Sequence, residues 1–127
     1  MTPNEFRSLA LNMPGAIEGA HMNHPDFRAN GRIFATLYPD GERGMVQLNP
    51  QQQADFVGRD AAAFVPASGA WGRNGSTTVQ LAVVNADQLG EAMTLAWQNT
   101  IKAAAEKKAR PKLAKKAAKK PGKSGKR

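Results

Sequence analysis

The sequence predicts an α+β fold: one compact domain with an antiparallel sheet flanked by three helices, followed by a lysine-rich tail. Residues 27–48 alternate apolar and polar side chains between two turn signals, which is typical of an antiparallel meander. Residues 89–104 repeat apolar side chains at helical spacing. We therefore expect a long helix to lie across the sheet and bury that stripe.

Two turn signals divide the meander. Asn30-Gly31 suits a two-residue type I′ hairpin, because both central residues of that turn need φ > 0. Pro39-Asp40-Gly41 supplies the second turn, since proline presets φ and glycine accepts the left-handed region. Each signal predicts a reversal of the chain between neighbouring strands.

The alternation of side chains defines the strands. Between the turns, Ile33, Ala35 and Leu37 occupy every second position, so this strand is expected to have one buried face. A further strand over residues 17–23 leads into the meander, and an alternating run over 76–84 provides a last strand. The predicted sheet therefore comprises the meander 17–48 and the strand 76–84.

Capping residues mark the start of two helices. Thr2-Pro3-Asn4-Glu5 has an N-cap, a proline at the first helical position and a glutamate placed for a capping box, so a helix is expected to run to about Asn12. Asn49-Pro50-Gln51-Gln52 starts a short middle helix by similar logic. Gly58 is its expected C-cap, and Asp60 can cap one further turn.

The long helix begins at Asn85 or Asp87. We expect it to end near Arg110, because Pro111 disfavours a helical conformation in the residue before it. The sequence that follows is mostly Ala, Lys, Pro and Gly and cannot bury enough apolar surface to offset the entropy of ordering. We therefore predict a domain over 1–108 and a disordered tail over 109–127.

Charge is divided unevenly along the chain. Residues 1–101 contain six arginines, no lysine and nine acids, a net charge of −3. Residues 102–127 contain twelve basic residues against Glu106, a net charge of +11, and together the parts give the overall +8. The absence of cysteine excludes disulfides and thiolate chemistry. Because we find no signal peptide and no apolar run long enough to span a membrane, we expect a cytoplasmic protein, with nucleoid association compatible with its tail.

Catalytic and metal-binding sets are not indicated. His21, His24 and Asp26 are the one conceivable metal cluster, but in a strand over 17–23 the two histidines would point to opposite faces. No serine lies in a G-x-S-x-G elbow, and Asp40, Asp60 and Asp87 are expected to act as turn or cap residues. We therefore predict no enzymatic activity, no metal and no cofactor.

Two groups of residues suit contacts with phosphate. Arg28, Arg32 and Arg43 flank the hairpin turns, and the planar guanidinium group can bind two phosphate oxygens at once. The alternative is that they are solvated strand residues paired with neighbouring acids. In the glycine-rich loop over 66–75, Arg73 is a further candidate contact, while Trp71 either covers the core, which we favour, or stacks on a base.

We expect the lysine-rich tail to bind the phosphates of nucleic acid without sequence preference, because binding releases counterions. The alternative is that the tail serves only solubility. The predicted DNA-binding residues are Arg28, Arg32, Arg43, Arg73, Lys112, Lys115, Lys116, Lys119, Lys120, Lys123, Lys126 and Arg127.

Several of these segments together resemble the MmcQ/YjbR family of small bacterial proteins. The resemblance rests on Met13-Pro14-Gly15 after the first helix, Phe27-Arg28, Gly31-Arg32-Ile33-Phe34-Ala35, and Pro66 with Trp71-Gly72 before an alternating strand. It covers about residues 1–108. It implies a compact fold with an antiparallel sheet flanked by helices, and a proposed DNA-binding role in which two hairpins act as wings. By position, Asn30-Gly31 and Pro39-Asp40-Gly41 would be the wing tips.

The combined reading is a non-enzymatic protein that binds duplex DNA largely independently of sequence. The sequence does not determine its oligomeric state, for which we favour a monomer. A wing that binds DNA should be basic, whereas residues 1–101 carry net negative charge, so the tail is expected to supply most of the affinity and the arginine-bearing hairpins the docking. The alternative is a protein-interaction or small-ligand adaptor whose tail only solubilises or localises it.

Overall fold

The structure is a computed structural model that describes the backbone of residues 1–118 and the side chains of residues 1–106. Its centre is a six-stranded sheet in the order β1-β2-β3-β4-β6-β5, in which every neighbouring pair is antiparallel. The strands are β1 (Ile17–His21), β2 (His24–Ala29), β3 (Arg32–Leu37), β4 (Arg43–Gln47), β5 (Phe64–Pro66) and β6 (Ser76–Gln80). The predicted α+β fold is confirmed.

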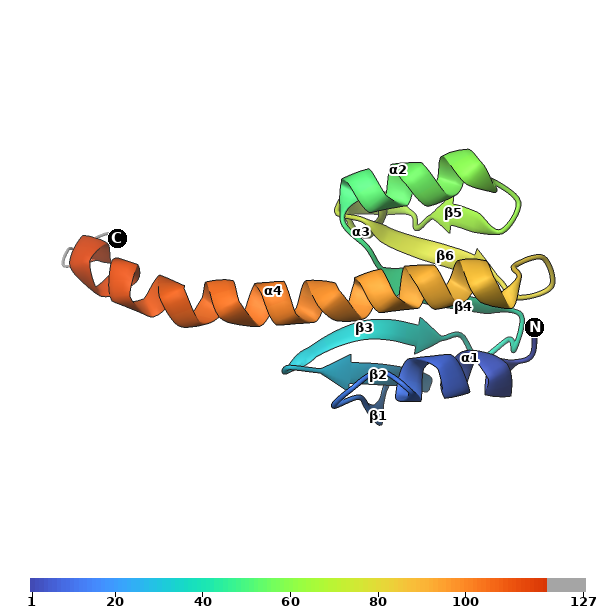
Figure 1. Ribbon diagram of the computed structural model, residues 1–127, viewed down its shortest axis with the longest axis horizontal. Coiled ribbons are helices and arrows are strands. Elements are labelled where there is room, and N and C mark those ends of the chain that lie inside the picture. The colour runs from blue at the N-terminus through green and yellow to red at the C-terminus, as the bar shows by residue number, and fades with distance from the viewer. Residues whose placement is uncertain (119–127) are drawn as a thin grey trace.

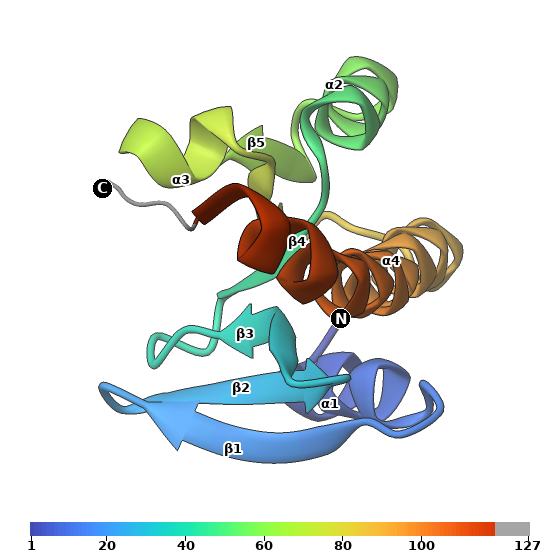
Figure 2. The same ribbon diagram turned by 90° about the vertical axis from the view of Figure 1, so that its left-hand side faces the viewer.

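Four helices accompany the sheet: α1 (Pro3–Leu11), α2 (Pro50–Arg59), α3 (Gly69–Arg73) and α4 (Ala86–Ala118). Figure 1 shows α4 crossing the sheet, with α1 on one side of it and α2 on the other. In Figure 2 these three helices lie on the same side of the strands, and the short α3 lies beside β5. The sheet therefore has one face covered by long helices.

The core lies between that face and the helices. All five phenylalanines are almost completely buried, and Phe6 of α1 meets Phe27 of β2 with ring centres 6.1 Å apart. Gly44 in β4 makes room for this contact, because a Cβ there would lie 2.5 Å from the Phe6 ring. From α4, Leu89 and Met93 complete the same core, as the helical spacing predicted.

Both expected capping boxes are present. Thr2 and Glu5 exchange side-chain-to-backbone hydrogen bonds at the start of α1, and Asn49 and Gln52 do the same for α2. The end of α2 differs slightly from expectation, because the helix continues past Gly58 and its C-cap is Asp60. The local sequence was sufficient to predict where both helices begin, since a capping box involves residues only three positions apart.

Strand β3 is buried on both faces in its second half, so the expectation of one buried face is wrong. The register between β2 and β3 shifts after Phe27 and leaves Phe34 as an extra residue without a partner. A bulge of this kind turns two consecutive side chains to one side of the sheet, which explains why Phe34 and Ala35 are both fully buried. Thr36 and Asp26, a cross-strand pair, are buried on the opposite face.

The first strand ends earlier than expected. It stops at His21, and Met22 and Asn23 form a two-residue turn with φ of 49° and 67° that leads directly into β2. Such a turn normally contains glycine, asparagine or aspartate at both positions. Because Met22 occupies the first position, the sequence did not predict a turn here. Both predicted turns also form, with positive φ at Asn30, Gly31 and Gly41.

The segment between α2 and α4 contains more regular structure than predicted. The loop expected over 66–75 contains the end of β5 and the whole of α3, both too short to show periodicity. The last strand ends at Gln80 instead of residue 84, because Val83 and Val84 donate backbone hydrogen bonds to the Gln80 carbonyl and close a turn.

The predicted end of the long helix at Arg110 is wrong. Helix α4 continues through Pro111 to Ala118. A proline inside a helix removes one backbone hydrogen bond and displaces the preceding turn, and the Ala- and Lys-rich sequence on either side favours helix strongly enough to continue. The expected disorder of residues 119–127 falls outside the described residues.

Candidate nucleic-acid interface

One end of the molecule brings together four segments that are distant in sequence. The start of β3, the end of β4 with the residues before α2, Asn74 after α3, and the middle of α4 line a shallow hollow of about 310 Å³. Figure 1 shows α4 leaving the sheet at this end. The polar residues that line the hollow are Arg32, Gln47, Asn49, Asn74, Asn99, Thr100, Lys102 and Glu106.

Three cations at this end carry no ion pair within the described side chains, residues 1–106: Arg32, Arg73 and Lys102. All three are exposed. Arg32 follows the hairpin turn, Arg73 ends α3 beside Asn74, and Lys102 lies on α4 across the hollow. We call these three residues the basic end.

Trp71 lies beside the basic end and not in the core. Its side chain is 74% exposed, so the expectation that it covers the core is wrong. Helix α3 packs against the backbone of Ala67 through Gly72, so closely that a Cβ on Gly72 would lie 1.7 Å from the Ala67 carbonyl oxygen. This contact fixes the orientation of the helix and leaves the Trp71 side chain on its exposed side. Gln53 fixes the same helix by donating hydrogen bonds to the carbonyls of Gly72 and Ser76.

Arg28 lies on the face of the sheet away from the long helices and is already paired. Its Nε and Nη2 donate to the two carboxylate oxygens of Asp26 at 2.7 and 3.1 Å, and Asp26 is fully buried. The hydrogen bonds from Arg28 and then from His21 hold the pKa of Asp26 below its usual value, although burial acts in the opposite direction. Arg28 is therefore better described as the partner of a buried acid.

Arg43 is paired as well. Its Nε donates to Asp40 at 2.8 Å, and its guanidinium carbon lies 4.8 Å from the centre of the Tyr38 ring. The ion pair lowers the pKa of Asp40 together with the hydrogen bond from the Glu42 backbone, which contributes most. Arg28 and Arg43 are therefore paired with neighbouring acids, which is the alternative to phosphate binding that the sequence left open.

The two expected wing tips lie at opposite ends of β3. Asn30-Gly31 precedes this strand and Pro39-Asp40-Gly41 follows it, so about 20 Å of extended chain separates them. Consecutive turns of a meander necessarily alternate between the ends of the sheet. The two tips therefore cannot form one tip surface, and α3 accompanies the first turn at the basic end instead.

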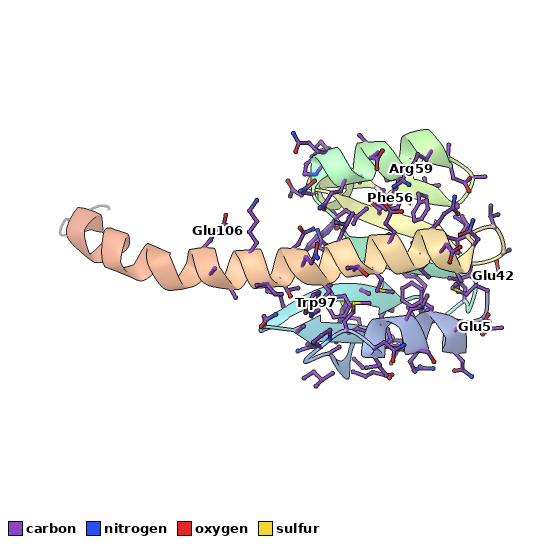
Figure 3. All side chains as sticks on the ribbon, in the orientation of Figure 1. Glu5, Glu42, Phe56, Arg59, Trp97 and Glu106 are labelled. Atoms are coloured by element: carbon purple, nitrogen blue, oxygen red, sulfur yellow. The ribbon has the colours of Figure 1, made fainter. Side chains whose placement is uncertain are left out.

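Acidic side chains gather at the other end of the molecule. Figure 3 shows Glu5 and Glu42 there, far from Glu106, which lies on the part of α4 that leaves the sheet. Arg59 of α2 is neutralised at its own site by Glu91 and Asp55, at 3.1 and 2.9 Å. The net negative charge of residues 1–101 is therefore unevenly distributed and does not describe the basic end.

The lysine-rich positions of the chain are only partly described. Lys112, Lys115 and Lys116 belong to the part of α4 that extends beyond Lys102, away from the sheet, and only their backbone is described. Their side chains lie outside the described residues, as do Lys119, Lys120, Lys123, Lys126 and Arg127 entirely.

Lys102 is not among the residues that the sequence predicts to contact DNA. The available signal was its position as the first lysine of the chain, next to the apolar stripe of α4 and before the basic run.

Among the described residues, no three His, Asp or Glu side chains converge on a position that could hold a metal ion. No helix within residues 1–118 combines the length and the apolar character that a membrane span requires.

Comparison with known proteins gives the class to which this fold belongs. The model of the YjbR family matches residues 11–99, and the chain belongs to that family. The crystal structure of Deinococcus radiodurans protein DR2400, described by the domain name DUF419, is similar with a TM-score of 0.64 at 19% identity, over 76% of this chain and 75% of that one. A search of curated proteins finds no match to this chain. The predicted family is confirmed, and at this identity the structural likeness supports the fold alone.

Proposed function

We propose that this YjbR-family protein is a non-enzymatic DNA-binding protein that contacts duplex DNA through the basic end and the lysine-rich continuation of α4. The observation that carries this proposal is that Arg32, Arg73 and Lys102 are exposed, with no acidic partner among the described side chains, at the end where α4 leaves the sheet. Unpaired guanidinium and ammonium groups on separate elements suit a phosphate backbone, because each can neutralise one phosphate and release counterions.

The proposal changes the division of roles among the arginines. To contact DNA, Arg28 would have to leave the buried carboxylate of Asp26 without its charged partner, which is costly. Arg43 would have to give up its exposed pair with Asp40, which opposes the contact less strongly. Arg32 and Arg73 pay no such cost. We therefore assign docking to the turn after β2 and to α3, and the larger share of electrostatic affinity to the basic residues from Lys102 onward.

Trp71 supports the same surface. An exposed aromatic side chain next to an arginine can pack against a sugar of the duplex once the phosphates are held, or stack on a base where the strands are unpaired, and neither contact depends on sequence. The amide groups around the hollow, such as Asn74 and Asn99, can add hydrogen bonds to phosphate oxygens.

A salt series of duplex binding tests the proposal in the full-length protein. We expect the triple variant R32Q/R73Q/K102Q to bind more weakly, with the slope of log K against log salt reduced by up to about 2.7, that is about 0.9 for each lost phosphate contact. The matched control is R7Q/R43Q/R59Q, which removes the same charge from arginines that have acidic partners. Its slope should remain close to that of the unmodified protein.

Two outcomes would contradict the proposal. If both triple variants lose affinity equally, binding depends on net charge and the basic end is not a docking surface. If neither changes binding, but replacing the lysines of residues 112–126 by glutamine abolishes it, the folded part has another role and the adaptor hypothesis is favoured.

A further inference from the structure

The hairpin between β1 and β2 places the two histidines of the chain side by side. His21 and His24 are directly opposite in the strand register, on either side of the Met22-Asn23 turn, and their ring centres lie 5.7 Å apart. Opposed residues of an antiparallel pair project from the same face. The expectation that these rings point to opposite faces is therefore wrong, because it assumed one continuous strand.

His21 is oriented by a buried carboxylate. Its Nδ1 lies 2.7 Å from an Asp26 oxygen, and the ring is 41% exposed while the Asp26 side chain is fully buried. A carboxylate accepts a hydrogen bond from Nδ1–H and leaves Nε2 with the lone pair that can bind a metal ion. Arg28 holds the carboxylate with two hydrogen bonds and balances its charge.

His24 is also restricted. Its ring packs edge-on against Tyr38 with centres 5.4 Å apart, and within residues 1–106 no hydrogen bond occupies its ring nitrogens. Tyr38 is covered in turn by Arg43, which Asp40 neutralises. Two imidazole groups thus share one face at the tip of a short hairpin, and one of them has its tautomer set by a carboxylate.

We propose that His21 and His24 together bind a late first-row divalent cation, such as Cu²⁺, Ni²⁺ or Zn²⁺, through one imidazole nitrogen each. Imidazole suits these ions, and a carboxylate behind a histidine is the arrangement that orients such ligands in metal sites. Two rings on one tetrahedral ion have centres about 5 Å apart, given metal–nitrogen bonds of about 2 Å, so small side-chain rotations close the present separation.

Water completes the coordination, and the affinity is correspondingly lower than that of a site with three or four protein ligands. Bound metal would connect the two ends of the Met22-Asn23 turn and stabilise the edge of the sheet. The order of affinity should place Cu²⁺ above Ni²⁺ and Zn²⁺.

The composition of the chain makes the test direct, because it contains two histidines and no cysteine. Titration calorimetry of the full-length protein, prepared without a histidine tag, should show one Cu²⁺ or Ni²⁺ per chain. H21Q and H24Q should each lower the affinity about as much as the double variant does, since a chelating pair loses its advantage when either member is removed.

Asp26→Asn tests the positioning role. It keeps both imidazoles and removes the carboxylate, so the affinity should fall about tenfold or more without a change in stoichiometry. The matched control is Asp55→Asn, which removes a carboxylate paired with Arg59 and should have no effect. Histidine ring signals in NMR spectra show in the same samples whether each variant is folded and whether substoichiometric Ni²⁺ broadens both rings together.

The proposal would be overturned by binding that survives in the double variant, by single variants that each keep half of the sites at unchanged affinity, or by broadening of one ring without the other. Binding too weak to detect at millimolar metal would do the same.

Discussion

At the scale of single residues, the most informative group is Asp26. It is the one acid that the described structure buries completely, and it holds two cationic or protonatable partners from neighbouring positions of the same hairpin. Opposite it, the Thr36 hydroxyl is buried and has no hydrogen-bond partner among the described residues. The face of the sheet away from the long helices therefore depends on the charge of Asp26 and on the His21 and Arg28 side chains that contact it.

Asp26→Asn should destabilise the protein in a pH-dependent manner. Since the folded state lowers the pKa of Asp26, its contribution is complete above the ordinary carboxyl pKa and is lost as the pH falls through the lower folded value. We expect a loss on the order of 2 kcal/mol at pH 7, which is typical of hydrogen bonds to a charged group, and a difference that shrinks below about pH 4. Urea unfolding at several pH values measures it. A difference that stays constant down to pH 3 would assign the effect to packing.

At the scale of elements, the short helix α3 is stabilised by close packing of its backbone against neighbouring backbone and not by the helix propensity of its residues. Five residues that include two glycines have little tendency to form a helix in isolation. Here the helix is held by backbone contacts that only glycine permits, at Gly72 and at Gly75, where φ is 113° and a Cβ would lie 2.0 Å from the Leu48 carbonyl oxygen. The position of Trp71 and Arg73 is thus a consequence of two glycines.

Two glycine-to-alanine substitutions in helices should have opposite effects. Gly72→Ala should cost more than about 2 kcal/mol, because its Cβ would meet backbone that cannot move aside. Gly58→Ala in α2 meets nothing within 4 Å and should stabilise the protein by about 0.5–1 kcal/mol through helix propensity. Chemical denaturation of both variants provides the comparison. Equal effects would show that the close approach at Gly72 does not restrict the site.

At the scale of the whole molecule, the separation of charge matters more than its sum. Acidic residues such as Glu42 and Asp87 lie toward the end where α4 begins, and Lys102 lies sixteen residues further along the helix, about 24 Å away. This distance exceeds the Debye length of about 8 Å at physiological ionic strength. A DNA duplex at the basic end would therefore be largely insensitive to the acids at the other end.

Neutralising the distant acids should leave DNA binding almost unchanged. We expect E42Q/D87N to alter the affinity for duplex DNA by less than about twofold near 150 mM salt, because screening removes the interaction over this distance. Fluorescence anisotropy on full-length protein measures the effect, with E106Q as the comparison that should strengthen binding. A large gain from the distant pair would mean that net charge governs association.

The parts of the fold that the sequence determined are those decided by neighbours in the chain. The capping boxes at Thr2 and Asn49 and the turn at Asn30-Gly31 are formed by residues within three positions of one another. The apolar stripe of α4 was equally readable, because a helix repeats its burial pattern over many turns. Family membership followed from the same local segments.

Tertiary structure alone decided which side chains are available for function. Arg28 and Arg32 flank the same turn. Arg28 is bound to a buried carboxylate, whereas Arg32 is exposed and has no acidic partner within residues 1–106, because strand register sets the neighbours of each. Trp71 is exposed because Gly72 packs against backbone five residues earlier, and the histidines meet because a turn formed where no glycine marked it. Periodicity in sequence reports burial along one element, whereas pairing depends on contacts between elements, which the order of residues does not encode locally.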